Sequence, residues 1–333
     1  MKKLLYVYII VFILFGIYFY NSHLNESWEN TSGIKRERLQ GSVNDEYVMV
    51  TFLAGIDYWK TALKGFEDAA SELNVSVVYR GGSQYDLHEQ ITVLEQVIAK
   101  KPSGIAISAI NPHDLNDTIN KAVDMGIPVV LFDADAPLSK ASSFLGTNNY
   151  DAGAKAADKM ASLVNKQGKV AVITLPDQLN HQERTAGFME TIKSNYPDIE
   201  VVQVLNGEGD QLKSEKVAKD IMRKYSDLKG IFVTEANGGV GVADAVKKNK
   251  ELDLKIISFD VDRKTLDNIE RGTISASIAQ GTWNMGYWSM EFLFKLHNEQ
   301  TNSAYNSLPP YVDTGITIVT KDNVKEYYAE YIK

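Results

Sequence analysis

Two aspartates occupy matched positions in the sequence, each directly after a short apolar run. Asp133 follows Val129–Phe132, and Asp260 follows Ile256–Phe259, 127 residues further along the chain. A carboxylate can accept two hydrogen bonds from neighbouring hydroxyl groups, such as those of a sugar. The alternative is that each aspartate caps the helix that follows it. Because both occur at equivalent positions of a repeated pattern, we favour ligand contact for this pair.

Other candidate ligand-binding residues also follow the ends of predicted strands. Tyr58 and Trp59 come after the first strand, and an aromatic ring can pack against the C–H face of a sugar, although an isolated aromatic residue usually lies in the core. Glu235 and Asn237 lie on a glycine-flanked turn, where we favour ligand contact. Asn111 precedes a proline, which is typical of a helix cap.

Catalytic motifs are absent from the sequence. It contains no Gly-x-Ser-x-Gly elbow, no His-Glu-x-x-His helix and no Walker phosphate loop. A Gly-Glu-Gly segment at 207–209 opens a helix, but Leu212 replaces the third glycine of a dinucleotide site. Asp260 and Asp262 lack the glycine and terminal glutamate of a calcium loop, and we interpret Asp135 and Asp262 as turn or capping residues. We therefore expect a binding protein without enzymatic activity, metal or cofactor.

The composition excludes further classes of function. At a net charge of −8 the chain lacks the basic face that phosphate backbones require, so nucleic acid is not an expected partner. The absence of cysteine excludes disulfides, cysteine-ligated metals and a lipid anchor attached through cysteine. A chain of 333 residues with 44% hydrophobic content can form two globular domains with cores of their own.

The N-terminus differs in composition from the rest of the chain. Residues 1–3 are basic and residues 4–20 are apolar and aromatic without a polar break, and a spanning helix needs roughly 17–25 such residues. We predict an uncleaved single-pass membrane anchor at 4–20, lysines inside and the remainder outside the cell, followed by a polar stalk at 21–45. The alternative is a cleaved secretory signal, although 18–24 lacks an Ala-x-Ala site.

From residue 46 onward, apolar strands alternate with helices, and the scheme occurs twice. Segment 104–111 matches 230–237 at an offset of 126. Wholly apolar strands that alternate with helices indicate parallel sheets covered on both faces. The predicted strands are 47–54, 75–79, 104–110, 129–132, 169–175, 199–205, 230–234, 255–259 and 316–319. The predicted helices are 59–73, 86–100, 112–125, 151–164, 182–195, 211–225, 239–248 and 285–296.

Residues 46–333 resemble the type-I periplasmic sugar-binding proteins, the ribose-binding family. The matching stretches are Asp57-Tyr58-Trp59, Phe132-Asp133, Glu183–Phe188, Gly230–Gly241, Ser258-Phe259-Asp260 and Ile278-Ala279-Gln280. The resemblance implies two similar doubly wound α/β lobes with a ligand cleft between them. It also implies that Arg184 reaches the ligand and that Gln280 faces the cleft. The predicted ligand-binding residues are Asp57, Tyr58, Trp59, Asp133, Arg184, Glu235, Asn237, Asp260 and Gln280.

The resemblance also implies three crossovers between the lobes, near 147–149, 280–281 and 308–310. They divide the chain into two predicted domains. The predicted N-terminal lobe is 46–148 plus 281–308, and the predicted C-terminal lobe is 149–280 plus 309–333.

Departures from the ribose-binding pattern bear on the ligand. Ala134 stands where the pattern has an arginine, and Ile56 and Asp57 stand where it has an asparagine before the aromatic pair. The segment 235–237 replaces an asparagine–aspartate pair. These departures argue against ribose and leave another pentose, a hexose or a similar hydroxylated molecule open.

The expected function is that of an extracytoplasmic receptor that closes its two lobes on a sugar. The expected membrane partner is either the permease of an ABC transporter or a sensor histidine kinase of a two-component system. A related family carries the same two-lobe core behind a DNA-binding helix-turn-helix. This chain has the predicted anchor at 4–20 in that place, which argues against a repressor.

Overall fold

The computed structural model describes residues 40–247, 253–299 and 308–328. The predicted membrane anchor at 4–20 and residues 21–39 of the predicted stalk at 21–45 lie outside the described residues. Within the described part, none of the helices combines the length and the apolar character needed to cross a membrane. The described helices and strands all lie within residues 41–333, which cluster as one compact unit.

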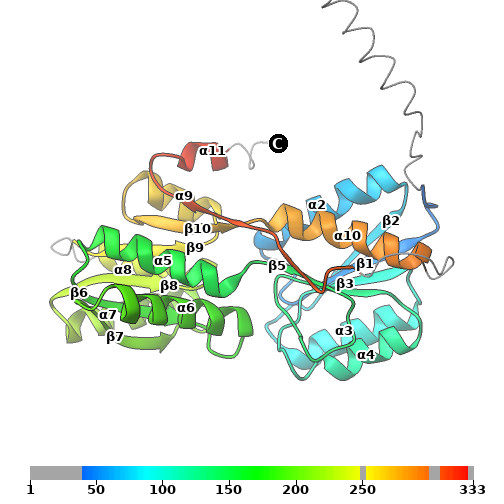
Figure 1. Cartoon of the computed structure of the whole chain (residues 1–333), viewed down its shortest axis with the longest axis horizontal. Helices are drawn as coiled ribbons and strands as arrows, with labels where there is room; N and C mark the ends of the chain where they lie inside the picture. Colours follow the sequence, from blue (N-terminus) through cyan, green and yellow to red (C-terminus); the bar gives the residue numbers. More distant parts are fainter. Residues whose placement is uncertain (1–39, 248–252, 300–307, 329–333) are drawn as a thin grey trace, which may run out of the picture. The chain divides into compact units, whose positions relative to one another are not determined.

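Two six-stranded sheets form the framework of residues 41–333 (Figure 1). The first sheet contains, in spatial order, β11 (Tyr311–Asp313), β5 (Phe144–Gly146), β4 (Val129–Phe132), β3 (Gly104–Ile107), β1 (Glu46–Thr51) and β2 (Ser76–Gly81). The second contains β12 (Ile316–Val319), β10 (Ala276–Gln280), β9 (Lys255–Phe259), β8 (Leu228–Val233), β6 (Gly168–Thr174) and β7 (Ile199–Asn206). The two orders are equivalent position by position, which confirms the repeat inferred from the sequence. All strand pairs are parallel except β10 with β12.

Helices cover both faces of each sheet, as the apolar strands predicted. In the N-terminal lobe, built on the first sheet, α2 and α10 lie on one face and α3 and α4 on the other (Figure 1). In the C-terminal lobe, α5 and α6 enclose one apolar core, and α7, α8 and α9 enclose the other. The bounds are α2 (Tyr58–Leu73), α3 (Leu87–Ala99), α4 (Asn116–Asp124), α5 (Asn149–Leu163), α6 (Leu179–Asn195), α7 (Gln211–Lys224), α8 (Ala236–Lys247), α9 (Arg263–Glu270), α10 (Thr282–Glu299) and α11 (Val324–Tyr328).

The chain passes between the two sheets three times. It leaves the first sheet after Gly146 and the second after Gln280. The third crossing was predicted near 308–310, but β11 pairs with β5 along 311–313. The crossing therefore lies at 314–315. The prediction missed this because β5 and β11 have only three residues each and show no periodic pattern. The limits of the two predicted domains stay a prediction.

Backbone hydrogen bonds hold these crossings side by side. The Thr314 N–H donates to the Gly146 carbonyl at 2.9 Å, and the Gly281 N–H donates to the Gly315 carbonyl at 3.0 Å. A Cβ at Gly281 would lie 2.1 Å from the Thr314 carbonyl oxygen, and Gly315 has a φ of +83°, which favours glycine. The three connections therefore form one compact joint between the lobes.

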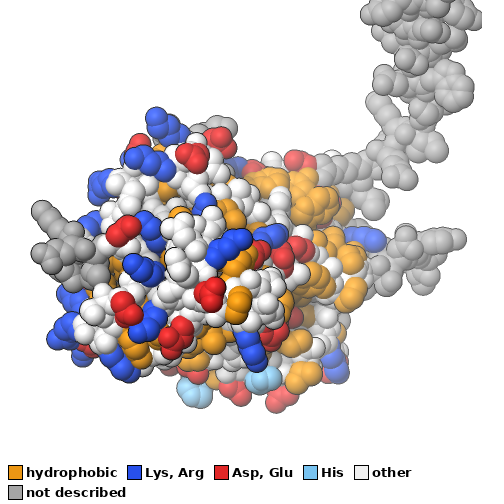
Figure 2. Space-filling model, turned by 60° about the vertical axis from the view of Figure 1, so that its left-hand side comes forward, with side chains coloured by type: hydrophobic (Ala, Val, Ile, Leu, Met, Phe, Trp, Pro, Cys, Tyr) orange, Lys and Arg blue, Asp and Glu red, His pale blue; other side chains and the backbone are white. Residues whose placement is uncertain are grey.

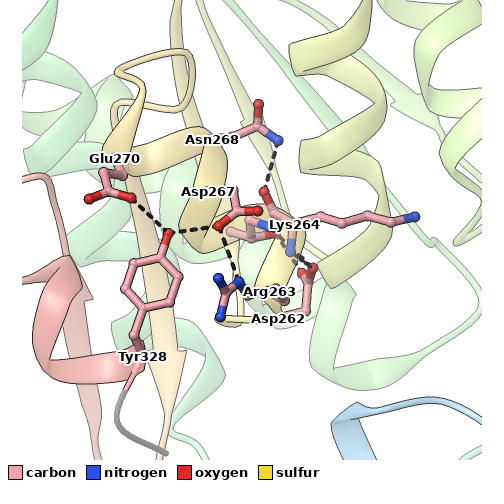
Figure 3. A network of polar contacts seen from close by, with 8 residues as sticks. Asp262, Arg263, Lys264, Asp267, Asn268, Glu270 and Tyr328 are labelled. Atoms are coloured by element: carbon pink, nitrogen blue, oxygen red, sulfur yellow. Dashed lines mark hydrogen bonds and ion pairs between the residues drawn. The ribbon is translucent and has the colours of Figure 1, made fainter. Parts of the chain in front are cut away.

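A polar cluster attaches helix α11 to helix α9 (Figure 3). The Tyr328 hydroxyl donates to Asp267 at 2.9 Å and lies 3.2 Å from a Glu270 oxygen. The Arg263 guanidinium lies over the Tyr328 ring, 4.7 Å from its centre. Asp262 accepts hydrogen bonds from the first-turn N–H groups of α9, which confirms the capping role inferred for it. The last described helix thus belongs to the C-terminal lobe.

Helices α5 and α6 approach each other closely because glycines face backbone at their contact. A Cβ at Gly153 would lie 2.0 Å from the Arg184 carbonyl oxygen, and one at Gly187 would lie 2.0 Å from the Tyr150 carbonyl oxygen. This close approach fixes the part of α6 that carries Arg184.

We expect Gly153→Ala to lower the free energy of unfolding by about 1–3 kcal/mol, because the added methyl group forces the two helices apart. Gly55→Ala is the control, since a Cβ there has no atom within 4 Å. Urea unfolding followed by tryptophan fluorescence measures both. Equal midpoints for Gly153→Ala and the wild type would show that the contact is not tight.

Candidate functional site

A cavity of about 110 Å³ lies between the two lobes, at the carboxyl ends of their strands, which is where open parallel sheets bind ligands. The N-terminal lobe contributes Phe52, Leu53, Ile56, Tyr58, Trp59, Tyr85 and Asp133. The C-terminal lobe contributes Leu175, Gln178, Asn180, His181, Arg184, Gly209, Glu235, Ala236, Asn237, Asp260 and Gln280. The structure therefore brings together all the predicted ligand-binding residues except Asp57.

The two matched aspartates have the same unusual backbone conformation. Asp133 and Asp260 both have a φ of 61°, in the left-handed region that aspartate tolerates better than most residues. Each N–H donates to the neighbouring strand: that of Asp133 to the Leu145 carbonyl at 3.1 Å, and that of Asp260 to the Ile278 carbonyl at 2.8 Å. Strained residues of this kind concentrate at functional sites, and here they turn both carboxylates to the cavity.

In the N-terminal lobe, Asp133 is held by two hydroxyl groups. The Tyr58 hydroxyl donates to one carboxylate oxygen at 2.5 Å, and the Ser108 hydroxyl donates to the other at 3.2 Å. Trp59 is only 2% exposed, and its indole N–H donates to the Phe52 carbonyl at 2.9 Å. Of the aromatic pair, Tyr58 therefore presents a polar group to the site, whereas Trp59 chiefly supports it.

Arg184 is the one cation among the cavity-lining residues and is 2% exposed. Its guanidinium donates to Asn149 at 2.9 Å, to the Thr234 carbonyl at 2.8 Å and to Gln280 at 2.8 Å. It also lies over the Phe259 ring, 3.8 Å from the centre. Because a guanidinium has five N–H donors, these three bonds hold it in place and leave donors for a ligand.

Gln280 connects both lobes at the cavity. Its amide oxygen accepts from Arg184 and from the Thr147 hydroxyl, each at 2.8 Å. Its amide nitrogen donates to Asp260 at 2.7 Å and to the Tyr58 hydroxyl at 3.2 Å. One side chain thus joins the acidic group of the C-terminal lobe to the aromatic residue of the N-terminal lobe.

Burial controls the charge state of the cavity. It raises the pKa of Asp260 from 3.8 to about 7 against the opposing effect of Arg184, and it raises the pKa of Asp133 in the same direction. It also raises the pKa of Tyr58, which keeps the donor to Asp133 protonated. Burial and the nearby Arg184 lower the pKa of His181, which favours a neutral imidazole. Burial therefore favours the neutral form of these groups, whereas Arg184 favours the ionised form of both carboxyl groups.

Glu235 and Asn237 line the cavity but also serve the start of α8. One Glu235 oxygen accepts from the Asn237 N–H at 2.7 Å, and the Asn237 amide donates to the Gly209 carbonyl at 3.1 Å. Burial raises the pKa of Glu235 to about 7. Both the capping role and the position at the cavity are thus present, and ligand contact stays a prediction.

Asp57 is not brought into the cavity. Its side chain is 62% exposed and pairs with Lys60 at 2.6 Å. The residue comes just before the first turn of α2, where its side chain lies at the outer surface while that of Tyr58 faces the cavity.

Three cavity-lining residues, at the end of the β6–α6 loop and in the first turn of α6, were not predicted from the sequence. Gln178, Asn180 and His181 are each at most 6% exposed. The repeat in the sequence could have indicated them. This loop follows the first strand of the second half, as the loop with Tyr58 follows the first strand of the first half.

The outer surface differs from the cavity. On the face shown in Figure 2, basic and acidic side chains are interspersed. Such a surface does not focus a field of one sign on one point.

A fold of two like lobes with a buried polar cavity between them defines a class of small-molecule binding proteins. A family model described as "Periplasmic binding protein domain" matches residues 47–301. The chain belongs to this family.

Three solved structures show how closely it resembles individual members. A sugar-binding protein of a sugar ABC transporter from Bacillus halodurans has 61% identity and a TM-score of 0.80, over 86% of this chain and 100% of that one. AraP, an arabinose binding protein from Geobacillus stearothermophilus, has 62% identity and a TM-score of 0.79, over 85% and 99%. The XylFII–LytSN complex contains a chain with 27% identity and a TM-score of 0.75, over 83% and 98%.

We expect Asp260→Asn to flatten the pH dependence of stability. Because the folded-state pKa is raised from 3.8 to about 7, the contribution of this group is fully present below about pH 4 and is lost as the pH rises through 7. The asparagine has no such titration. The fall in the free energy of unfolding between pH 4 and 7.5 should therefore be smaller than in the wild type.

Urea unfolding over this pH range, without sugar, measures the difference. Asp57→Asn serves as a control outside the cavity. If the free energy of unfolding of Asp260→Asn falls as steeply with pH as that of the wild type, the raised pKa of Asp260 is contradicted.

Proposed function

We propose that this protein is an extracytoplasmic receptor that closes its two lobes on a monosaccharide, a pentose in the first place. The observation that carries the proposal is the chain of buried polar contacts from Asp133 through Tyr58 and Gln280 to Asp260 and Arg184. These groups come from both lobes and meet at one cavity, so a single small molecule can contact both sides at once.

The hydrogen-bonding capacity left in this network supports a ligand rich in hydroxyl groups. Arg184 retains N–H donors beyond its three protein partners. Gln280 occupies one oxygen of Asp260, and the other has no hydrogen-bond partner among the described residues. A hydroxyl group can accept from the arginine and donate to the aspartate, whereas a charged ligand would leave an unbalanced charge in a buried site.

The size and lining of the cavity support a single sugar ring. Its volume of about 110 Å³ is below the roughly 300–1,000 Å³ of pockets for drug-sized ligands. Tyr58 and Phe52 supply aromatic surface, which suits the apolar face of a sugar ring.

The mechanism of the proposed receptor is a shift between open and closed arrangements. Within residues 41–247, 253–299 and 308–328, the three crossings at the joint are the only covalent links between the lobes, so rotation there separates the two walls of the cavity. A ligand that contacts both walls binds the closed form better and shifts the population toward it. No bond of the ligand is made or broken.

Arabinose is the first sugar to test. AraP, an arabinose binding protein, shares 62% identity with this chain. The departures from the ribose-binding pattern at Ala134 and at 235–237 also point away from ribose.

We expect arabinose to raise the melting temperature, because a ligand that binds only the folded state stabilises it by mass action. Asp260→Asn and Arg184→Lys should each weaken binding by roughly 10- to 150-fold, since each removes a hydrogen bond that involves a charged group. Asp57→Asn, outside the cavity, should bind as the wild type does. Thermal shift over a panel of pentoses and hexoses, followed by calorimetry, makes the measurement. Absence of a shift with every sugar would reject the sugar receptor.

A second candidate is a dedicated sugar-sensor subunit of a membrane histidine kinase rather than a transport receptor. The XylFII–LytSN complex, in which a chain of this fold binds another protein, favours it. The apolar stretch 4–20 also favours it, since a receptor anchored in the membrane is placed beside a membrane partner. The relative from a sugar ABC transporter favours the transport role. Permease and ATPase genes beside this gene would support transport, and a histidine kinase gene would support sensing.

We expect the full chain to stay in the membrane pellet after alkaline extraction, because we propose that 4–20 spans the bilayer. A variant with three lysines within 4–20 should lose membrane retention. N-terminal sequencing of the mature protein is the decisive companion measurement. A mature chain that begins beyond residue 20 would mean a cleaved signal.

A further inference from the structure

Gln178 lies at the N-terminal cap of helix α6, but its side chain does not cap the helix. It precedes the first residue of α6, at the N-cap, with a φ of −107° and a ψ of 136°, and its side chain makes no capping hydrogen bond. Short side chains such as serine, aspartate and asparagine normally fill this position. The side chain of Gln178 is nevertheless buried, at 4% exposure, and it lines the cavity between the lobes.

The amide of Gln178 carries an unpaired donor. Among the described residues, its Nε2 has no hydrogen-bond partner. Neighbouring amide side chains in the first turn of α6 do have partners: the Gln182 Nε2 donates to the Pro176 carbonyl at 2.7 Å, and the Asn180 oxygen accepts from the His181 N–H at 3.0 Å. Buried polar groups are nearly always hydrogen-bonded, and an unpaired one at a cavity wall calls for a partner in the cavity.

Gln178 also lies where the two lobes face each other. A hydrogen-bonding interaction with the Gln178 side chain lowers the pKa of Tyr85, against the larger effect of burial, which raises it to about 12. The two groups do not meet the distance and angle of a regular hydrogen bond, so the Gln178 Nε2 still lacks a full partner among the described residues. The Tyr85 ring packs edge-on against Phe52 of the same lobe, with centroids 5.5 Å apart. The Gln178 amide therefore has Tyr85 of the opposite lobe beside it only when the lobes are closed.

We propose that Gln178 is a specificity-determining residue of the sugar site, whose Nε2 donates a hydrogen bond to one hydroxyl oxygen of the bound sugar. The inference rests on the proposed function and assigns to the β6–α6 loop a direct part in choosing the sugar. A sugar that places a hydroxyl group opposite this amide satisfies the donor. A sugar without that hydroxyl leaves it buried and unpaired, and binds more weakly.

The test compares Gln178→Met with the wild type, using calorimetry with arabinose and its mono-deoxy analogues. Methionine keeps the length of the side chain and removes the donor. We expect roughly 10- to 100-fold weaker binding of arabinose. The mono-deoxy analogue without the contacted hydroxyl should bind both proteins with equal affinity. The other analogues should show the same ratio of wild-type to variant affinity as arabinose does. The ligand-free melting temperature should change little, because the Nε2 group makes no regular hydrogen bond with a described residue.

Gln182→Met is the matched control, since it removes the same amide from the same helix at an exposed position, and it should bind arabinose as the wild type does. If Gln178→Met fails to fold, Gln178→Leu removes the same donor without adding a hydrogen-bond acceptor or a charge and gives the same comparison. Wild-type affinity in these variants, or an equal loss for every deoxy analogue, overturns the inference alone. If the wild type binds no pentose or hexose, the proposed function fails and the inference fails with it.

Discussion

The structure of the site depends on the four hydrogen bonds of the Gln280 amide. Its oxygen accepts from Arg184 and Thr147, and its nitrogen donates to Asp260 and Tyr58. An amide is suited to this place because it both accepts and donates, so it can lie between a cation and an anion without adding charge. Gln280 is also the last residue before the chain crosses to the other lobe. The same residue therefore belongs to the site and to the joint, which couples their geometry.

Some features of the site occur in both lobes and follow from the repeat, whereas others differ between the lobes. The aspartates at the ends of β4 and β9 keep the same φ of 61° and the same bond to the next strand. Ser108 and Thr234, the hydroxyl residues after β3 and β8, are also equivalent, but their partners differ. Ser108 donates to Asp133, whereas Thr234 donates to Thr174. The N-terminal lobe therefore pairs its aspartate with the Tyr58 hydroxyl. The C-terminal lobe instead binds the Arg184 guanidinium through the Thr234 carbonyl.

The sequence was sufficient for the long, strongly periodic elements and for their order. The bounds of β4, β9 and β12 agree with the predicted ones, because each is a short, mostly apolar run that ends directly before a polar residue. Helix α4 starts at Asn116 rather than at 112, since the Asn111 side chain accepts from the N–H groups of residues 113 and 114 and holds a separate turn there. The short strands β5 and β11 and helix α9 were not predicted, because three to eight residues give little periodic signal.

The site residues were predictable where a repeat or a motif marked them, and not where tertiary packing alone decides. Asp133 and Asp260 stood out because they recur, and Arg184 and Gln280 because of the family pattern. Asp57 was included as the neighbour of Tyr58, but adjacent residues at the start of a helix point in different directions.

The buried charged groups affect the balance between the open and closed forms of the proposed receptor. Arg184 lies among Asp133, Asp260 and Tyr58, each of which acts on its ionisation through space. Asp133 belongs to the N-terminal lobe and Arg184 to the C-terminal lobe, so opening separates opposite charges and returns both to water. Hydration of the separated charges then favours the open form, and their attraction in the dry cavity favours the closed one. Because these two effects oppose each other, the balance can be small, and the hydrogen bonds of one sugar are then enough to decide it.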